Sequence, residues 1–168
     1  MVTRRRAAGF TLMELMVTIA IMAFLLLAGL PFMNAWVDGV RQMQARNQLL
    51  DGIGQARALA LRNPASLAAD QPVAMLRMVG REAQVVMPPA GTTVWTAQLH
   101  EAVVLNTAGK TVPSTRTLKH GNDARFRCVA FNSRGIRLPN ASNCILPLTI
   151  DRIAIGAGNQ DPIHVELL

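Results

Sequence analysis

The sequence predicts an α+β fold, in which a long N-terminal α-helix is packed on an antiparallel β-sheet C-terminal domain. Three observations predict this fold. Residues 12–33 are almost entirely apolar, and Glu14 and Thr18 are the main exceptions. From there to residue 62, apolar residues recur near the helical period. The rest of the chain contains short apolar runs separated by glycine, proline and asparagine, which is typical of strands and turns.

The first half of the predicted helix is long enough to span a membrane. Residues 15–33 are apolar, and at ~1.5 Å per residue about twenty residues cover the ~30 Å hydrocarbon core of a bilayer. Arg4, Arg5 and Arg6 lie just before this segment, and no comparable basic cluster follows it closely. Because basic residues favour the cytoplasmic side, we expect a cytoplasmic N-terminus and the bulk of the chain outside the membrane.

The second half of the predicted helix is amphipathic. Pro64 should end it, because proline disfavours the helical conformation in the preceding residue, Asn63. Pro31 removes one backbone hydrogen bond and is expected to bend or locally melt the helix. We expect one apolar stripe to pack on the sheet as part of the core. Its members are Trp36, Val37, Val40, Met43, Leu49, Leu50, Ile53, Ala56, Leu59 and Ala60.

The remaining segments predict strands and one small globular domain. A hairpin is expected where residues 73–79 and 83–87 meet at Gly80-Arg81. The last pair of strands, at 148–155 and 163–167, is joined by the turn-forming residues 156–159. Further strands are predicted around Trp95, at 103–105 and at 125–131.

Cys128 and Cys144 are the only cysteines in the chain. Their spacing is neither that of a metal site nor that of a redox C-x-x-C motif. Outside the cytoplasm such a pair favours a disulfide. The alternative is two buried free thiols.

Glu14 distinguishes between three interpretations of the N-terminus. A carboxylate in an apolar segment costs up to about 2.5–3.5 kcal/mol at mid-bilayer. Neither a secretory signal cleaved near residues 26–28 nor a plain signal anchor explains it. A cut after Gly9 would give Phe10 a free ammonium group, four residues and one helical turn from Glu14. The carboxylate could then neutralise the amine of its own chain or of a neighbouring subunit.

These residues resemble a known family. Residues 9–15, Gly-Phe-Thr-Leu-Met-Glu-Leu, resemble the type III signal of type IV prepilins and pseudopilins, and Pro31 falls where pilin helices commonly carry a proline. The resemblance implies that a prepilin peptidase cleaves after Gly9 and methylates Phe10, and that Glu14 serves assembly. It also implies a pilin-like fold. The implied partners are the prepilin peptidase, other major and minor pilins or pseudopilins, and the inner membrane.

The resemblance also implies a domain organisation and a location. Residues 1–9 form a leader removed by the peptidase, and residues 10–33 form the transmembrane and filament-core half of the helix. Residues 34–63 form its amphipathic half, and residues 64–168 form a periplasmic β-rich globular domain. The expected protein crosses the inner membrane once, with a cytoplasmic N-terminus, and later enters a pilus or pseudopilus filament.

Two later segments indicate a subgroup. Residues 55–63, Gln-Ala-Arg-Ala-Leu-Ala-Leu-Arg-Asn, resemble the end of the long helix in the GspH/FimT group. Residues 131–135, Phe-Asn-Ser-Arg-Gly, resemble a late strand and turn common there. That group contains minor pseudopilins of type II secretion and minor pilins of type IV pili. The resemblance implies a minor subunit that primes or tips such a filament.

The charge distribution suggests an alternative function. The formal net charge is +7, and without Arg4, Arg5 and Arg6 it would be +4. Residues 110–137 hold seven basic residues and one acid, Asp123, which indicates either a solvated face or an anion-binding patch. Some FimT-like minor pilins bind DNA during natural transformation through a G-R-x-R motif. Residues 134–137, Arg-Gly-Ile-Arg, exchange the first two positions, and Arg134 and Arg137 are the candidate DNA-binding residues.

Nothing in the sequence indicates an enzyme. It contains no nucleophile elbow, phosphate-binding loop or paired-acid motif. His100, His120 and His164 are isolated from one another and from ligand-type spacing. We expect no catalytic residue, no cofactor and no metal site.

Overall fold

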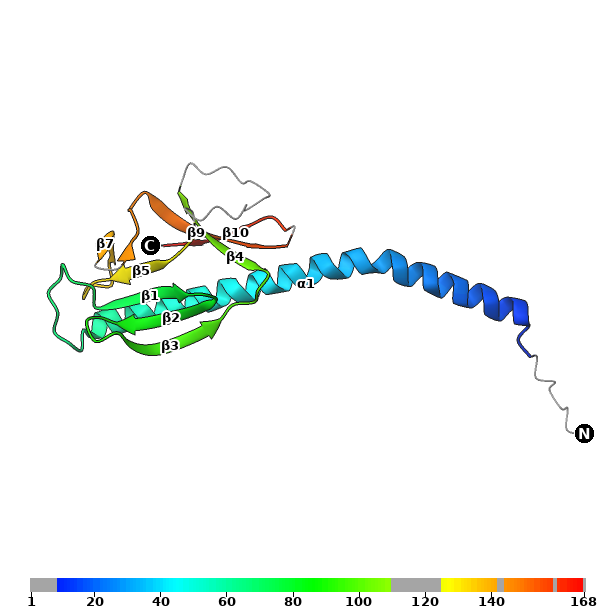
Figure 1. Cartoon of the computed structure of the whole chain (residues 1–168), viewed down its shortest axis with the longest axis horizontal. Coiled ribbons are helices and arrows are strands. Elements are labelled where there is room, and N and C mark those ends of the chain that lie inside the picture. The colour runs from blue at the N-terminus through cyan, green and yellow to red at the C-terminus, as the bar shows by residue number, and fades with distance from the viewer. Residues whose placement is uncertain (1–8, 110–124, 142–143, 159, 168) are drawn as a thin grey trace, which may run out of the picture. The chain divides into compact units, whose positions relative to one another are not determined.

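The computed structural model describes residues 9–109, 125–141, 144–158 and 160–167. The chain divides into two compact units, Met1–Trp36 and Val37–Leu168. Helix α1 (Leu12–Arg62) contributes to both units (Figure 1). Ten strands follow it among the described residues, and all of them belong to the second unit. The predicted α+β arrangement, a long helix packed on antiparallel sheets, is confirmed.

Helix α1 begins with a side-chain cap. The backbone N–H of Glu14 donates to Thr11 Oγ1 at 3.2 Å, and the N–H of Leu15 donates to the Thr11 carbonyl at 3.2 Å. Thr11-x-x-Glu14 is the sequence of a capping box, in which a threonine satisfies a backbone donor of the first turn. A carboxylate in that turn also interacts favourably with the helix dipole. The helix start is therefore fixed locally, without tertiary contacts.

The predicted end of α1 is confirmed. Asn63 has a positive φ of 40°, a conformation that asparagine tolerates at helix ends. Its side chain also caps the following turn, accepting from the N–H of Leu67 and donating to the Leu67 carbonyl, both at 2.9 Å. The helix is continuous through Pro31, so the backbone is not melted there. Proline removes only one hydrogen bond from the helical ladder.

Two antiparallel sheets lie beside α1 in the second unit. The five-stranded sheet has the order β3-β2-β1-β5-β6, and the three-stranded sheet has the order β10-β9-β4. A two-stranded hairpin pairs β7 (Asn140–Ala141) with β8 (Cys144–Ile145). The strands of the larger sheets are β1 (Ala74–Val79), β2 (Glu82–Met87), β3 (Thr92–Gln98), β5 (Cys128–Phe131), β6 (Arg137–Leu138), β4 (Val103–Gly109), β9 (Ile150–Ala157) and β10 (Ile163–Glu166).

Most strand predictions are confirmed with shifted ends. Strands β1 and β2 form the predicted hairpin, and Gly80 occupies its turn with φ 62°. The segment predicted at 125–131 is shorter, because only Cys128–Phe131 forms β5, while Arg125 makes an isolated bridge to Asn106. The C-terminal pair is present as β9 and β10, with β9 beginning two residues later than predicted.

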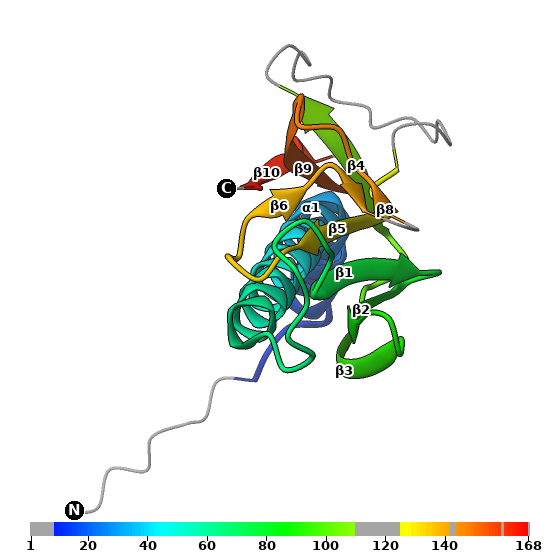
Figure 2. The ribbon, with the colours of Figure 1, turned by 90° about the vertical axis from the view of Figure 1, so that its left-hand side faces the viewer.

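The apolar stripe predicted on α1 is wrong in part. The core contains Ala45, Leu49, Ile53, Ala56 and Ala60, but four members of the predicted stripe are exposed. These four are Trp36, Val40, Met43 and Leu50, with exposed fractions between 41% and 72%. At 100° per residue, Val40, Met43 and Leu50 fall on the side of the helix opposite Ala56. The strands lie around one side of the second half of α1, and the described residues leave its other side uncovered (Figure 2).

Two contacts fix the second half of α1 against the strands. Gly52 allows close approach to the five-stranded sheet, since a Cβ there would lie 2.9 Å from Trp95 Cζ3 and 3.0 Å from Leu76 Cδ1. Gln42 is buried, and its Nε2 donates to the carbonyls of Ile155 at 2.7 Å and Asp161 at 2.8 Å. The buried amide thereby holds the β9–β10 hairpin on the helix.

The five-stranded sheet also carries a small apolar cluster away from the main core. It joins Met75 of β1 and Val86 of β2 to Cys128, Ala130, Ala141 and Cys144. Cys128 and Cys144 form a disulfide with a Cα–Cα distance of 5.7 Å. The predicted pairing is therefore confirmed, and the bond fastens β8 to β5. The five-stranded sheet therefore contributes buried apolar side chains to two separate clusters, the main core and this smaller one.

Candidate processing and assembly site

The predicted cleavage point lies in exposed backbone directly before α1. Gly9 and Phe10 belong to no helix or strand, and both are exposed. The first helical residue is Leu12. Exposed segments outside regular structure are the preferred positions of proteolytic cleavage. The bond between Gly9 and Phe10 is therefore accessible without unwinding α1.

Gly9 has no structural requirement for glycine among the described residues. A Cβ built at this position meets no atom within 4 Å. The fold would therefore accept a side chain here. Any strict need for glycine must come from a molecule that binds the segment.

Glu14 lies in the first turn of α1, exposed and within an apolar surface. The ion pairs found among the described residues join Arg41 to Asp38, Arg81 to Glu101 and Arg152 to Asp151, and none reaches Glu14. Its backbone N–H is satisfied by Thr11, so the cap uses the main chain of Glu14 and leaves its carboxylate oxygens for another partner.

The helix that follows this site is apolar on every side. Large apolar residues from Leu12 to Leu27 are exposed in the first unit, among them Met16, Ile19 and Phe24. Surfaces of this extent mark contact with a membrane or with other proteins. In the described part of the chain, α1 is the helix whose length and composition suit a membrane crossing. These properties indicate membrane anchoring through α1.

A family comparison agrees with the geometry of this N-terminal segment. Residues 4–30 match the model of the prokaryotic N-terminal methylation motif. Comparisons with curated proteins and with solved structures find no match to the chain. The matched segment contains Gly9, Phe10 and Glu14, and it covers the start of α1.

The motif and the fold agree with one another. A long apolar helix that carries the methylation motif and is followed by antiparallel sheets is a pilin-like arrangement. Such a leader implies processing by a prepilin peptidase and assembly with other pilins.

The second predicted site contains Arg134 at a tight turn after β5. Asn132 Oδ1 accepts from the N–H groups of Arg134 at 3.0 Å and Ile136 at 2.9 Å. Gly135 has φ 69°, which an L side chain rarely adopts. The turn places the Arg134 side chain in solvent.

Arg137 does not join Arg134 in solvent. It is buried, with an exposed fraction of 9%. Its guanidinium donates to the carbonyl of Leu148 at 3.2 Å and to the carbonyl of Ile150. Burial lowers the pKa of Arg137 from its ordinary value, and the nearby carboxylate of Asp151 partly opposes this. Arg137 therefore ties β6 to the start of β9 and is not presented to a phosphate.

The rest of the basic stretch is only partly described. Arg125 and Arg127 are exposed. Lys110, Arg116, Lys119 and Asp123 lie outside the described residues, as does His120. Of the other histidines, His100 Nδ1 accepts from the N–H of Ala102 at 3.1 Å, and His164 is exposed on β10. No group of metal-ligating side chains occurs in the described ranges.

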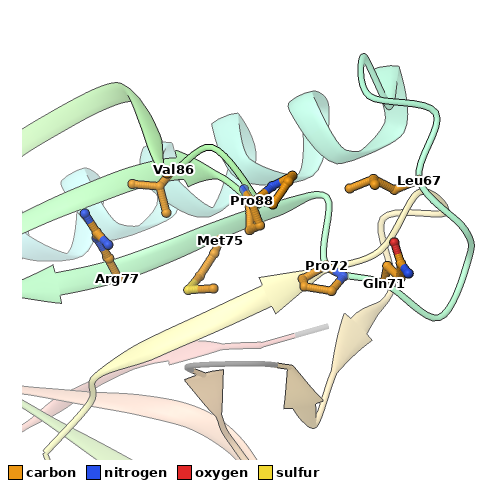
Figure 3. A pocket seen from close by; sticks show the side chains of 9 residues that line it. Leu67, Gln71, Pro72, Met75, Arg77, Val86 and Pro88 are labelled. Carbon is orange, nitrogen blue, oxygen red and sulfur yellow. The ribbon is translucent and has the colours of Figure 1, made fainter.

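A hollow of about 450 Å³ lies beside β1 and β2 (Figure 3). Met75 and Val86 line it together with Pro72 and Pro88. Arg77 also lines it, and its Nε and Nη2 donate to Gln84 Oε1 at 3.3 and 3.2 Å. The described residues bring no nucleophile or carboxylate to this hollow, so it supports no catalytic proposal.

Sequence reasoning missed two residues that shape these sites. Thr11 caps α1 immediately after the predicted cleavage point, and the spacing Thr11-x-x-Glu14 could have revealed this. Gln42 anchors the β9–β10 hairpin. Gln42 is one of several polar residues in this part of the helix, such as Arg41 and Gln44, and carries no comparable signal. Its burial depends on a hairpin more than a hundred residues away.

Proposed function

We propose that this chain is a prepilin whose mature form is a filament subunit anchored in the inner membrane. The observation that carries the proposal is the methylation motif at residues 4–30, where Gly9 and Phe10 lie in exposed backbone just before an apolar helix. A prepilin peptidase cleaves after Gly9 and methylates the new amine of Phe10. The globular part lies in the periplasm before assembly.

Glu14 serves assembly in this proposal. Cleavage creates a positive charge at Phe10, one residue before the cap of α1. An unpaired charge inside a bilayer or an apolar filament core is costly, so each group favours a partner of opposite sign. Glu14 is exposed and lies four residues from Phe10. It pairs with the amine of its own chain or with that of a neighbouring subunit.

The disulfide supports the location of the globular part. Disulfides form and persist in oxidising compartments such as the bacterial periplasm. Cys128 and Cys144 lie in the second unit, beyond the apolar part of α1. The basic residues Arg4, Arg5 and Arg6 before the helix favour a cytoplasmic N-terminus.

Within this class we place the chain among minor subunits of the GspH/FimT kind, which prime or tip a type IV pilus or a type II secretion pseudopilus. The support is the sequence of residues 55–63 and 131–135. In the structure the first segment forms the last turns of α1, and the second forms the end of β5 and the turn after it. DNA binding stays an alternative prediction that rests on exposed Arg134, Arg125 and Arg127.

Mass spectrometry of the protein purified from its own host tests the proposal. The mature chain should begin at Phe10 and carry one added methyl group on its amine. It should be found in the membrane and in sheared filaments. A start near Gly29 would identify a conventional signal peptide and would refute the proposal. An uncleaved chain beginning at residue 1 would refute it as well.

A further inference from the structure

The second half of α1 carries an apolar face that the fold does not use. Val40, Met43 and Leu50 lie on its uncovered side, and the carboxylate of Asp51 is exposed next to them. At 100° per residue these four side chains span about one third of the helix circumference. We name them the helix stripe. Asn47 is also exposed and lies within this span. A mostly apolar stripe with one acid is the pattern of a helix that docks into a groove.

A groove elsewhere in the second unit has the complementary character. It has a volume of about 410 Å³ and lies between the end of α1, the turn before β6 and the segment before β9. Leu61, Ile136 and Leu148 line it with exposed fractions between 56% and 63%. Exposed apolar side chains that gather in one hollow form a candidate docking surface. We name it the arginine groove.

The charges of the groove are basic. Arg57 and Arg134 line it, and none of its described lining residues is acidic. The guanidinium of Arg57 lies over the Phe131 ring, 5.2 Å from its centroid. Its Nε is buried and has no acceptor among the described residues. A carboxylate entering the groove would supply an acceptor that the chain itself does not provide.

From this complementarity we infer that the helix stripe of one copy of this chain docks in the arginine groove of a second copy, with Asp51 facing Arg57 and Arg134. The two surfaces are different parts of one molecule, so the contact is head-to-tail and does not close on itself. The inference rests on the proposed function, because it assigns one contact between subunits of the filament.

Disulfide crosslinking of the full chain in its own host tests this contact. The native cysteines are already paired, so introduced cysteines report the new contact alone. Two tagged copies are co-expressed, one with Met43→Cys and one with Ile136→Cys. Oxidation should give a covalent dimer that carries both tags. The matched control replaces Ile136→Cys by Val79→Cys, since Val79 is also apolar and exposed but lies outside the groove.

Charge reversal tests the named ion pair. Asp51→Arg should lower the crosslink yield about 2- to 5-fold, the effect of an exposed ion pair. Combining it with Arg134→Asp on the other copy should restore the yield. If the crosslink yield is the same with Asp51→Arg alone and with the combined Arg134→Asp change as in the unchanged pair, Asp51 has no role in the contact.

The docking itself would be overturned by the absence of a dimer or by an equal amount of dimer in the Val79→Cys control. A dominant dimer of two Met43→Cys copies would also overturn it, because it would indicate two stripes pairing symmetrically. A groove cysteine that links only to a different pilin would also overturn it. Cleavage after Gly9 and recovery of the chain in sheared filaments are measured in the same samples. Normal cleavage and recovery without the dimer would refute the docking and leave the proposed function standing.

Discussion

Helix α1 has two halves that present apolar side chains in different ways. In the first unit, Leu12 to Leu27 are exposed on all sides, and no polar face orients the helix. In the second unit, α1 buries Leu49, Ala56 and their neighbours against the sheets while Met43 and Leu50 stay exposed. Helical periodicity alone does not explain the difference. Small residues and the buried Gln42 decide which side of the second half meets the strands.

The comparison separates two kinds of sequence requirement. In the first half, residues serve contacts with other molecules, since their side chains are exposed and make few contacts within the chain. In the second half, the buried residues matter for packing within the chain. Substitutions in the first half should therefore change processing and assembly without changing the stability of the second unit. The predictions below test this division, from the largest expected effect to the smallest.

Replacing Gly9 should have the largest effect. Under the proposed processing, Gly9→Leu should abolish cleavage, because the peptidase would require glycine before the cut bond. The fold itself should accept the new side chain, since a Cβ at Gly9 meets no atom within 4 Å. The uncleaved chain should accumulate in the membrane, as measured by immunoblot and intact mass. Thermal unfolding of the second unit should be unchanged. Normal cleavage of this variant would contradict a requirement for glycine at the processing site.

Replacing Glu14 should impair assembly, a step that follows cleavage. Glu14→Ala should be processed to a chain beginning at Phe10 but be recovered poorly in filaments, because the amine loses its partner. Thr11→Ala is the matched control: it removes the cap of α1, worth about 1 kcal/mol of helix stability, and keeps the carboxylate. Quantitative recovery from sheared filaments measures both. Equal recovery of Glu14→Ala and wild type would rule out the proposed pairing.

Loss of the disulfide should affect the second unit alone. The loop-entropy model gives about 3 kcal/mol for a closed loop of this size, so Cys128→Ala with Cys144→Ala should lower the free energy of unfolding by roughly that amount. Denaturant titration of the mature protein in detergent measures it. Non-reduced peptide mapping of wild type should find the two cysteines linked. Free thiols in protein taken from the periplasm would contradict the bond.

Two glycines of α1 should respond in opposite directions. Gly52→Ala should destabilise the second unit by about 1–3 kcal/mol, because its Cβ would collide with Trp95 and Leu76. Gly54→Ala should stabilise it by about 0.5–1 kcal/mol, because a Cβ there meets no atom within 4 Å and alanine favours the helix. The denaturant midpoint of unfolding, compared between each variant and wild type, measures both effects. Equal effects would mean that α1 does not approach the sheet at Gly52.

The smallest expected effect concerns DNA. If the basic residues bind duplex DNA, Arg134→Ala should lower the log–log salt slope by about 0.9, as expected for one lost phosphate contact. Arg137→Ala should leave the slope unchanged and instead lower stability by about 1–3 kcal/mol, since the carbonyls of Leu148 and Ile150 lose their donor. A fluorescence titration of the full chain in detergent measures the slope. No binding at low salt would remove DNA from consideration.

The sequence was sufficient wherever a local rule decides the structure. The end of α1 follows from the proline after Asn63, and the β1–β2 turn follows from Gly80. The face of α1 that packs on the sheets was not predictable. Leu49 and Leu50 are both apolar, and periodicity cannot say which of them faces the sheet. The position of Arg137 was not predictable either. Its burial depends on β9, which approaches it only in the folded chain.

The cap at Thr11 has a consequence for the timing of assembly. The helix begins after the cleavage point, and its first donors are satisfied by Thr11, which stays with the mature chain. Under the proposed processing, cleavage therefore changes the charge of the N-terminus without having to create the helix. A precursor waiting in the membrane already has its final helical shape but lacks the cation that Glu14 needs. Under this proposal, the time of cleavage determines when a subunit becomes able to assemble with its neighbours.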